Sequence, residues 1–171
     1  MENMFCFQCQ EASKGTGCEI KGVCGKTPEV SALQDLLIYQ LKGLSHYTTA
    51  LRLLGIENEA ANLFITDSLF MTITNANFDY ERFVNRIREG FKLRSQLKAT
   101  LLENKVEPEK TELLTWTALT AAEMELIAER VGVLSTENED VRSLRELTIY
   151  GLKGMAAYVE HAQNLGYNDN E

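Results

Sequence analysis

The sequence predicts an all-α protein. An N-terminal cysteine-rich loop is followed by a three-helix bundle and by further helices that begin a second, incomplete bundle. After the loop, apolar residues recur at spacings of three, four and seven, which is the period of a helix with one buried face. Both prolines, Pro28 and Pro108, fall between these helical patterns, where helical proteins tolerate them. With 171 residues, 44% of them hydrophobic, the chain can bury a core.

Three helices are expected in the first half of the chain. The first follows Pro28 and ends near Gly55, a residue typical of helix C-termini. A second apolar run covers residues 63–73 and stops near residues 75–79. Asp79 is expected to cap a third helix, which the second proline ends. The inward residues of that third helix are Phe83, Val84, Ile87, Phe91, Leu97 and Leu101.

The second half holds two helix-start signals. Residues 109–119 have no clear period, and Trp116 is expected to anchor them to the core. Two capping boxes follow, in which a threonine and a glutamate three residues later satisfy each other's backbone N–H groups. The pairs are Thr120 with Glu123, before a helix to about Val131, and Thr136 with Glu139, before a last helix that runs to Leu165.

An internal repeat relates the first and last helices. At an offset of 111 residues, positions 30–55 match positions 141–166 with eleven identities, including the string Ile-Tyr-x-Leu-Lys-Gly. Gly43 and Gly154 are equivalent, and a repeated glycine inside a helix indicates a repeated close contact. The repeat predicts that a second bundle begins and then stops, and we expect a truncated chain. The expected domains are a cysteine-rich loop (1–28), a three-helix bundle (29–107) and a helical segment (108–171).

Composition narrows the classes of function. A net charge of -8 argues against a nucleic-acid partner, which needs a basic face. No apolar run approaches the roughly 20 residues of a membrane span. The N-terminus has neither the basic nor the apolar region of an export signal, which predicts a cytoplasmic protein.

Four cysteines form the candidate site. Cys6, Cys9, Cys18 and Cys24 have the spacing C-x2-C-x8-C-x5-C, and residues 25–171 contain no other cysteine. Four thiolates on one short segment can saturate a tetrahedral metal or hold an iron–sulfur cubane. Disulfides are the alternative, but they belong to oxidising compartments. The site is therefore predicted to bind a metal or cluster.

The spacing leaves two metals open. Structural zinc sites use two short C-x2-4-C knuckles, and only Cys6 and Cys9 form one here. Compact four-cysteine runs are common for [4Fe–4S] clusters. The spacing favours the cubane, and zinc remains the alternative. Because Phe5, Phe7, Ile20 and Val23 are the only apolar anchors expected for the loop, its order should depend on the metal.

Several strings of this sequence resemble one family. The strings are Met4-Phe-Cys-Phe-Gln-Cys-Gln-Glu11, Gly17-Cys18, Lys21-Gly-Val-Cys-Gly-Lys26, Leu33-Gln-Asp-Leu-Leu-Ile-Tyr39, Thr72-Ile-Thr-Asn-Ala-Asn77, Thr136-Glu-Asn-Glu-Asp-Val-Arg-Ser-Leu-Arg-Glu146 and Gly151-Leu-Lys-Gly-Met-Ala-Ala-Tyr158. They are similar to the N-terminal part of the hybrid cluster protein family, also called prismane protein or hydroxylamine reductase. The resemblance implies a [4Fe–4S] cubane on Cys6, Cys9, Cys18 and Cys24.

The same resemblance implies that the catalytic centre lies outside this chain. Family members carry a second, hybrid iron–sulfur–oxygen cluster on later cysteines, a histidine and glutamates. This chain has no such cysteines, and its only histidines are His46 and His161. The expected function is therefore a [4Fe–4S] electron-transfer domain, with reduction of hydroxylamine or nitric oxide elsewhere. The alternative is a non-catalytic helical module stapled by zinc or another metal.

The remaining expectations concern partners and single residues. Expected partners are a redox donor, the downstream domains of the family, and a second copy of the chain through the last helix. His46 and His161 are expected at the surface, Tyr39 and Tyr150 in the core. The acidic residues Glu137, Glu139 and Asp140 are expected at a helix N-terminus, where the helix dipole favours negative charge.

Overall fold

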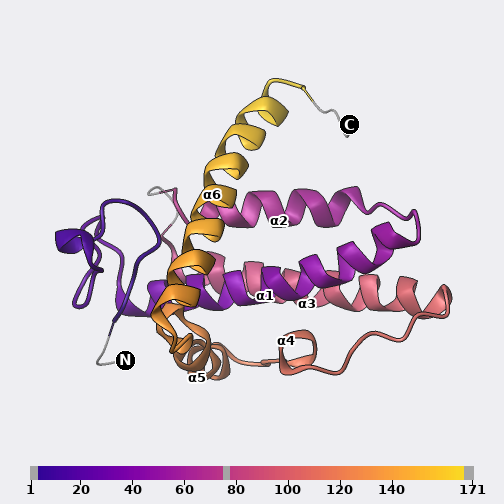
Figure 1. Ribbon diagram of the computed structural model, residues 1–171, viewed down its shortest axis with the longest axis horizontal. Coiled ribbons are helices and arrows are strands. Elements are labelled where there is room, and N and C mark those ends of the chain that lie inside the picture. Colours follow the sequence, from indigo (N-terminus) through magenta and orange to yellow (C-terminus); the bar gives the residue numbers. More distant parts are fainter. Residues whose placement is uncertain (1–3, 75–77, 168–171) are drawn as a thin grey trace.

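A computed structural model describes residues 4–74 and 78–167 (Figure 1). Its regular elements are helical, apart from one isolated bridge between Cys6 and Cys18, so the expected all-α fold is confirmed. Six α-helices are described: α1 (Pro28–Leu53), α2 (Glu59–Met71), α3 (Tyr80–Glu103), α4 (Glu112–Thr115), α5 (Ala121–Val131) and α6 (Glu139–Asn164). Two short 3-10 turns, η1 (Ser13–Gly15) and η3 (Val133–Ser135), complete them. The division into three domains stays a prediction.

Polar side chains start the long helices. At α1 the Thr27 hydroxyl accepts a hydrogen bond from the Val30 N–H at 3.4 Å, and Pro28 supplies a first residue that needs no N–H partner. At α3 the Asp79 carboxylate accepts from the Arg82 N–H at 3.2 Å, which confirms Asp79 as the cap. The predicted interruption at residues 75–77 lies outside the described residues.

One of the two expected capping boxes forms. Thr120 and Glu123 make it at the start of α5, with the Glu123 N–H donating to the Thr120 hydroxyl at 3.2 Å. The box expected between Thr136 and the first residue of α6 is wrong. Asn138 takes the N-cap position instead, and its side-chain oxygen accepts from the Val141 N–H at 2.9 Å. Asparagine caps at least as well as threonine and stands closer to the helix.

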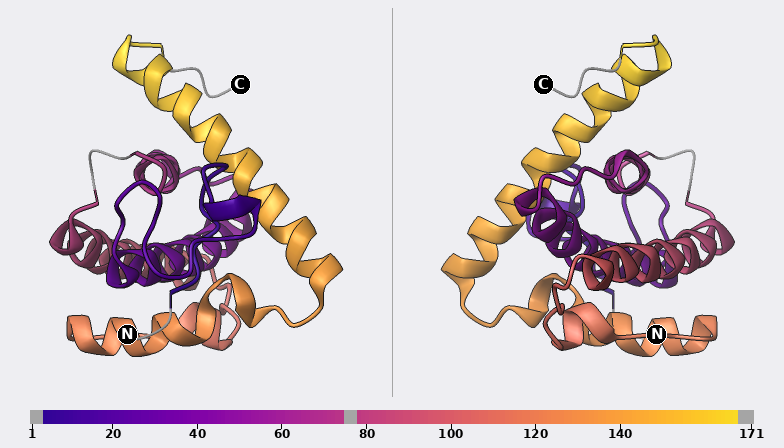
Figure 2. Two further views of the ribbon diagram at one scale, coloured as in Figure 1. Left: turned by 90° about the vertical axis from the view of Figure 1, so that its left-hand side faces the viewer. Right: turned by 90° about the vertical axis from the view of Figure 1, so that its right-hand side faces the viewer.

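The core surrounds α1. In Figure 1, α1, α2 and α3 run alongside one another, and Figure 2 shows α5 on the side of α1 away from α2. The helices α1 and α3 approach closely at Gly90, where any side chain would collide with the Gln40 amide. That amide donates to the Ile87 carbonyl at 2.9 Å. The largest fully buried apolar side chains are Tyr47, Phe83, Leu33, Leu36, Leu37, Leu44, Leu51, Ile87, Leu97, Leu101 and Met124.

Trp116 fixes the irregular segment between α3 and α5, as the sequence predicted. Its indole is 7% exposed and meets the Phe91 ring edge-on at 4.8 Å. The buried Arg94 guanidinium donates to the Trp116 carbonyl at 2.7 Å. On the other side, the Tyr47 hydroxyl donates to the Leu114 carbonyl at 3.3 Å.

The last helix, α6, is the least covered of the long helices. It packs against α2 and crosses one end of the bundle, and its C-terminal part extends beyond α2 (Figures 1 and 2). Its only buried residues are Lys153 and Ala156. Tyr150 is 39% exposed, so the expectation of a core position is wrong for this residue. The reason is that α1 packs against α2, α3, α4 and α5, whereas α6 packs mainly against α2. Across the part of the chain that the structure describes, no helix combines the length and apolar character of a membrane span.

Candidate metal centre

The structure brings the first and third cysteines together. Cys6 and Cys18 face each other across an antiparallel bridge, in which each backbone N–H donates to the other's carbonyl at 2.9 Å. Both are buried, whereas Cys9 and Cys24 are half-buried. All four are free thiols. The bridge fixes the spacing of two thiol-bearing strands that are twelve residues apart in the sequence.

Two N–H donors reach these sulfurs. The Lys26 ammonium lies 3.5 Å from the Cys6 sulfur, and the Ser13 backbone N–H donates to the Cys18 sulfur at 3.4 Å. Lys26 is 2% exposed, and its ammonium also donates to the Gln34 side chain. Donors of this kind stabilise negative charge on a thiolate and orient a metal ligand.

Two glycines allow the segment to fold tightly. Gly17 has a φ of 148°, and a side chain there would collide with the Phe5 ring. At Gly22 an added Cβ would lie 3.0 Å from the Cys24 sulfur. Glycine therefore allows the backbone to lie close to the Phe5 ring at one position and close to the Cys24 sulfur at the other.

Four thiols are suitable ligands for a metal or a cluster, but in this structure they are not gathered into one site. Four free thiols lie on one segment, and two of their sulfurs receive N–H donors. Over residues 4–74 and 78–167, however, no three or more His, Cys, Asp or Glu side chains are gathered closely enough to hold a metal ion.

The apolar anchors differ from the expected set. Ile20 is 88% exposed and Val23 is 65% exposed, so neither anchors the segment. Phe5 is half-buried, as is Phe7, and the buried Met4 was not expected. Hydrophobicity alone suggested Ile20 and Val23 as anchors, but both side chains are exposed to solvent.

A buried chain of polar groups joins the cysteine segment to α1 and α6. The Gln8 side chain, 4% exposed, donates through Nε2 to Asp35 Oδ1, and its Oε1 accepts from the Lys153 ammonium. Burial raises the pKa of Asp35 to about 7, although Lys153 and the Gln8 hydrogen bond oppose the rise. Burial lowers the pKa of Lys153 to about 8, opposed by Asp35. No periodicity of the sequence signals these residues.

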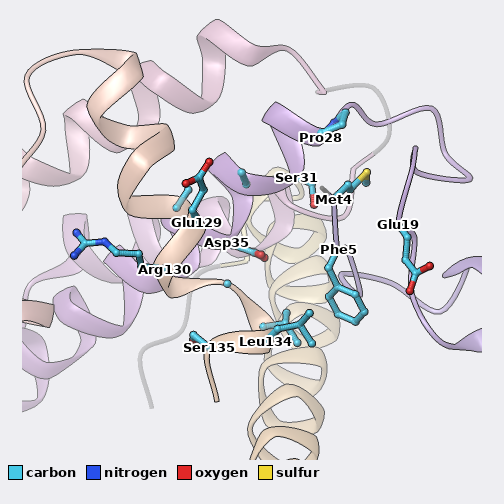
Figure 3. Close-up of a pocket in the computed structure, with 14 residues that line it drawn as sticks. Met4, Phe5, Glu19, Pro28, Ser31, Asp35, Glu129, Arg130, Leu134 and Ser135 are labelled. Atoms are coloured by element: carbon cyan, nitrogen blue, oxygen red, sulfur yellow. The ribbon is translucent and has the colours of Figure 1, made fainter. Parts of the chain in front are cut away.

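A cavity of about 800 Å³ lies beside this chain of groups (Figure 3). Ser31 and Asp35 line it from α1, Met4 and Phe5 from the cysteine segment, and Leu134 from η3. The Ser31 hydroxyl is buried and has no hydrogen-bond partner. The cavity is thus an open groove with the Asp35 carboxyl group on its wall.

The other candidate residues lie away from the cysteines. His46 and His161 are exposed, and each meets an aromatic ring, Tyr47 and Phe70 respectively, at 6.3 Å between centroids. Tyr39 is half-buried against Trp116. The acidic residues Glu139 and Asp140 lie exposed in the first turn of α6, as expected for a helix N-terminus.

Fold and site together define a helical protein with a four-thiol segment packed against one end of its bundle. A sequence profile of the Prismane/CO dehydrogenase family matches residues 4–171, and the chain belongs to that family. Curated relatives named hydroxylamine reductase are similar to it. One from Parabacteroides distasonis is 58% identical over 97% of this chain, and one from Desulfitobacterium hafniense is 58% identical over 98%. One from Clostridium novyi is 52% identical over 99%.

The match covers only part of each relative. This chain spans 30% of the length of the Parabacteroides distasonis protein and 31% of the Desulfitobacterium hafniense and Clostridium novyi proteins. The activity in the names of these relatives therefore belongs to proteins about three times as long as this chain.

Proposed function

We propose that this chain is a [4Fe–4S] electron-transfer domain that corresponds to the N-terminal part of a hydroxylamine reductase. The observation that carries the proposal is that its only four cysteines, all free thiols, lie on one segment of a prismane-family chain. The residues that would hold the cluster are Cys6, Cys9, Cys18 and Cys24. When bound, the cluster would supply one-electron transfer.

The chain's own residues tune such a site. Lys26 donates a hydrogen bond to the Cys6 sulfur, and the Ser13 N–H donates one to the Cys18 sulfur. Hydrogen bonds to sulfur and burial are two of the means by which proteins set the potential of an iron–sulfur site. Free thiols persist in a reducing compartment, so the proposal also places the protein in the cytoplasm.

In this proposal, reduction of hydroxylamine or nitric oxide takes place outside this chain. Residues 25–171 contain no cysteine for a second cluster. The partners are accordingly a redox donor and a catalytic part like the one that makes up the rest of the longer relatives.

Metal analysis of anaerobically purified protein tests the proposal. The expected result is about four iron and about four sulfide per chain, with brown colour. Serine at any one of the four cysteines should lower the iron content, whereas Gln10→Ala, an exposed position in the same segment, should leave it unchanged. A colourless protein with one zinc per chain would contradict the proposal and would favour a metal-stapled structural module.

A further inference from the structure

One of the two residues between Cys6 and Cys9 does not face solvent. Gln8 lies between Cys6 and Cys9, and its side chain is turned inward. Its amide oxygen accepts from Lys153 of α6, and its amide nitrogen donates to Asp35 of α1. Lys153 also donates to the Gln8 backbone carbonyl at 3.4 Å. The amide can satisfy an ammonium and a carboxylate only in this orientation, because Lys donates and a carboxylate accepts.

Keeping this arrangement buried is costly. Lys153 is 3% exposed, and burial disfavours its charged form as it disfavours that of Asp35. The other charged groups near the pair are Lys26 of the cysteine segment and Glu146 of α6. Buried charges persist where each has a well-placed partner, and they specify one geometry more than they add stability.

The internal repeat allows the burial of Lys153 to be compared with that of an equivalent lysine. Its equivalent in α1 is Lys42, which is exposed. The same helical string therefore leaves lysine in solvent in one copy and buries it in the other. Lys153 is one of two buried residues of α6, and its ammonium donates hydrogen bonds to Gln8 of the cysteine segment.

We propose that Lys153, Gln8 and Asp35 form a clasp that positions the Cys6–Cys9 knuckle, so that α6 helps to set the geometry of the four-thiol site. The link to the cluster rests on the proposed function, but the positioning of residues 4–9 does not. All three are positioning residues. Gln8 acts on the cysteines through the backbone, and Asp35 and Lys153 act through Gln8.

Hydrogen exchange on the cluster-free full chain tests the clasp. In Lys153→Met, exchange of the amides of residues 4–9 should rise about tenfold, with Lys42→Met as the matched control. Lys153→Arg, which keeps the donor and the charge, should restore most of the protection. Unchanged exchange in Lys153→Met, or an equal rise in Lys42→Met, would overturn the proposal.

A second pair of variants covers the case in which Lys153→Met does not fold. Gln8→Met keeps the size of the side chain but removes both hydrogen bonds, and Gln10→Met changes the exposed glutamine of the same segment. Faster exchange at residues 4–9 in Gln8→Met alone supports the clasp. Equal exchange in the two variants overturns it.

The reduction potential of the chain with its cluster bound is a further measurement. It would not change if Lys153 had a purely structural role. Removing a buried cation disfavours the more negatively charged reduced state. Lys153→Met should therefore lower the equilibrium constant for one-electron reduction about tenfold, or about 59 mV, while Lys42→Met leaves it unchanged. A wild-type chain that binds no cluster would end the proposed function, and the exchange experiment would still decide the clasp.

Discussion

Charged side chains lie in the interior of this protein, close to the four cysteines. Lys26 donates to the Cys6 sulfur, and Lys153 and Asp35 meet at Gln8. In a chain with a net charge of -8, two lysines are thus buried next to the thiols.

The carboxyl group of Asp35 predicts a pH dependence. Its pKa is about 7 in the folded chain and about 3.9 in the unfolded chain. The unfolded chain therefore loses this proton at lower pH than the folded chain does. The stability contributed by the protonated form is complete below about pH 4 and is lost as the pH rises to about 7.

Asp35→Asn should remove this dependence. Between about pH 4 and about pH 7 the wild type should lose roughly 3 kcal/mol of unfolding free energy relative to the variant. Denaturant unfolding of both proteins across this range measures it. Lys153 does not interfere, because its pKa of about 8 places its own change at higher pH. Parallel curves for the two proteins would show that Asp35 ionises normally.

The helices α1 and α6 share a sequence pattern but have different surroundings. Leu33, Leu36 and Leu44 of α1 are completely buried, whereas their equivalents Leu144, Leu147 and Met155 of α6 are 64 to 68% exposed. The repeated glycines differ likewise. A Cβ at Gly43 would lie 2.9 Å from the Leu113 carbonyl oxygen, and a Cβ at Gly154 would meet no atom within 4 Å. The repeated close contact that the sequence predicted is present in one copy only.

The two glycines should respond oppositely to alanine. Gly43→Ala should lower the unfolding free energy by about 1 to 3 kcal/mol, because the clash is with backbone that cannot turn aside. Gly154→Ala should raise it by up to about 1 kcal/mol through helix propensity. Urea unfolding of the two variants measures both effects. A stabilised Gly43→Ala would mean that the segment carrying Leu113 moves freely away from α1.

Local signals predicted the helices well and the buried polar groups poorly. The cap at Asp79, the anchor at Trp116 and the box at Thr120 follow from short-range rules, which act within one turn or through one large side chain. The clasp at Gln8 was not predictable, because it joins residues 27 and 145 positions apart. The cysteines were identified from their spacing, but the bridge between Cys6 and Cys18 depends on the folded path of the segment.

At the scale of the whole molecule, the uncovered face of α6 should drive association. Leu147 is 68% exposed and Tyr158 is 81% exposed on the same helix. A large exposed apolar surface marks an interaction site. We expect the isolated chain to pair with a second copy through α6, in place of the parts that accompany this segment in the longer relatives.

Light scattering at increasing protein concentration measures this association. Leu147→Lys should shift the population toward monomer by weakening the dimer about tenfold or more. Leu53→Lys, at a position of α1 that is 84% exposed, is the control and should have no effect. A wild type that stays monomeric up to millimolar concentration would contradict the expectation.

The chain alone should not turn over hydroxylamine. It has no cysteine beyond Cys24 with which to build a second cluster. Anaerobic assays with a chemical reductant should give no reduction above that of an equal amount of free iron–sulfur cluster. Saturable reduction by the purified chain would mean that the four-thiol site itself reacts with substrate.

Spin counting tests whether a cluster on the four thiols transfers single electrons. Anaerobically prepared protein is reduced and its paramagnetic resonance signal integrated. We expect about one unpaired spin per chain, from a single cubane that gains one electron and loses it again on reoxidation. A protein that carries zinc, or iron that gives no reversible signal, would contradict it.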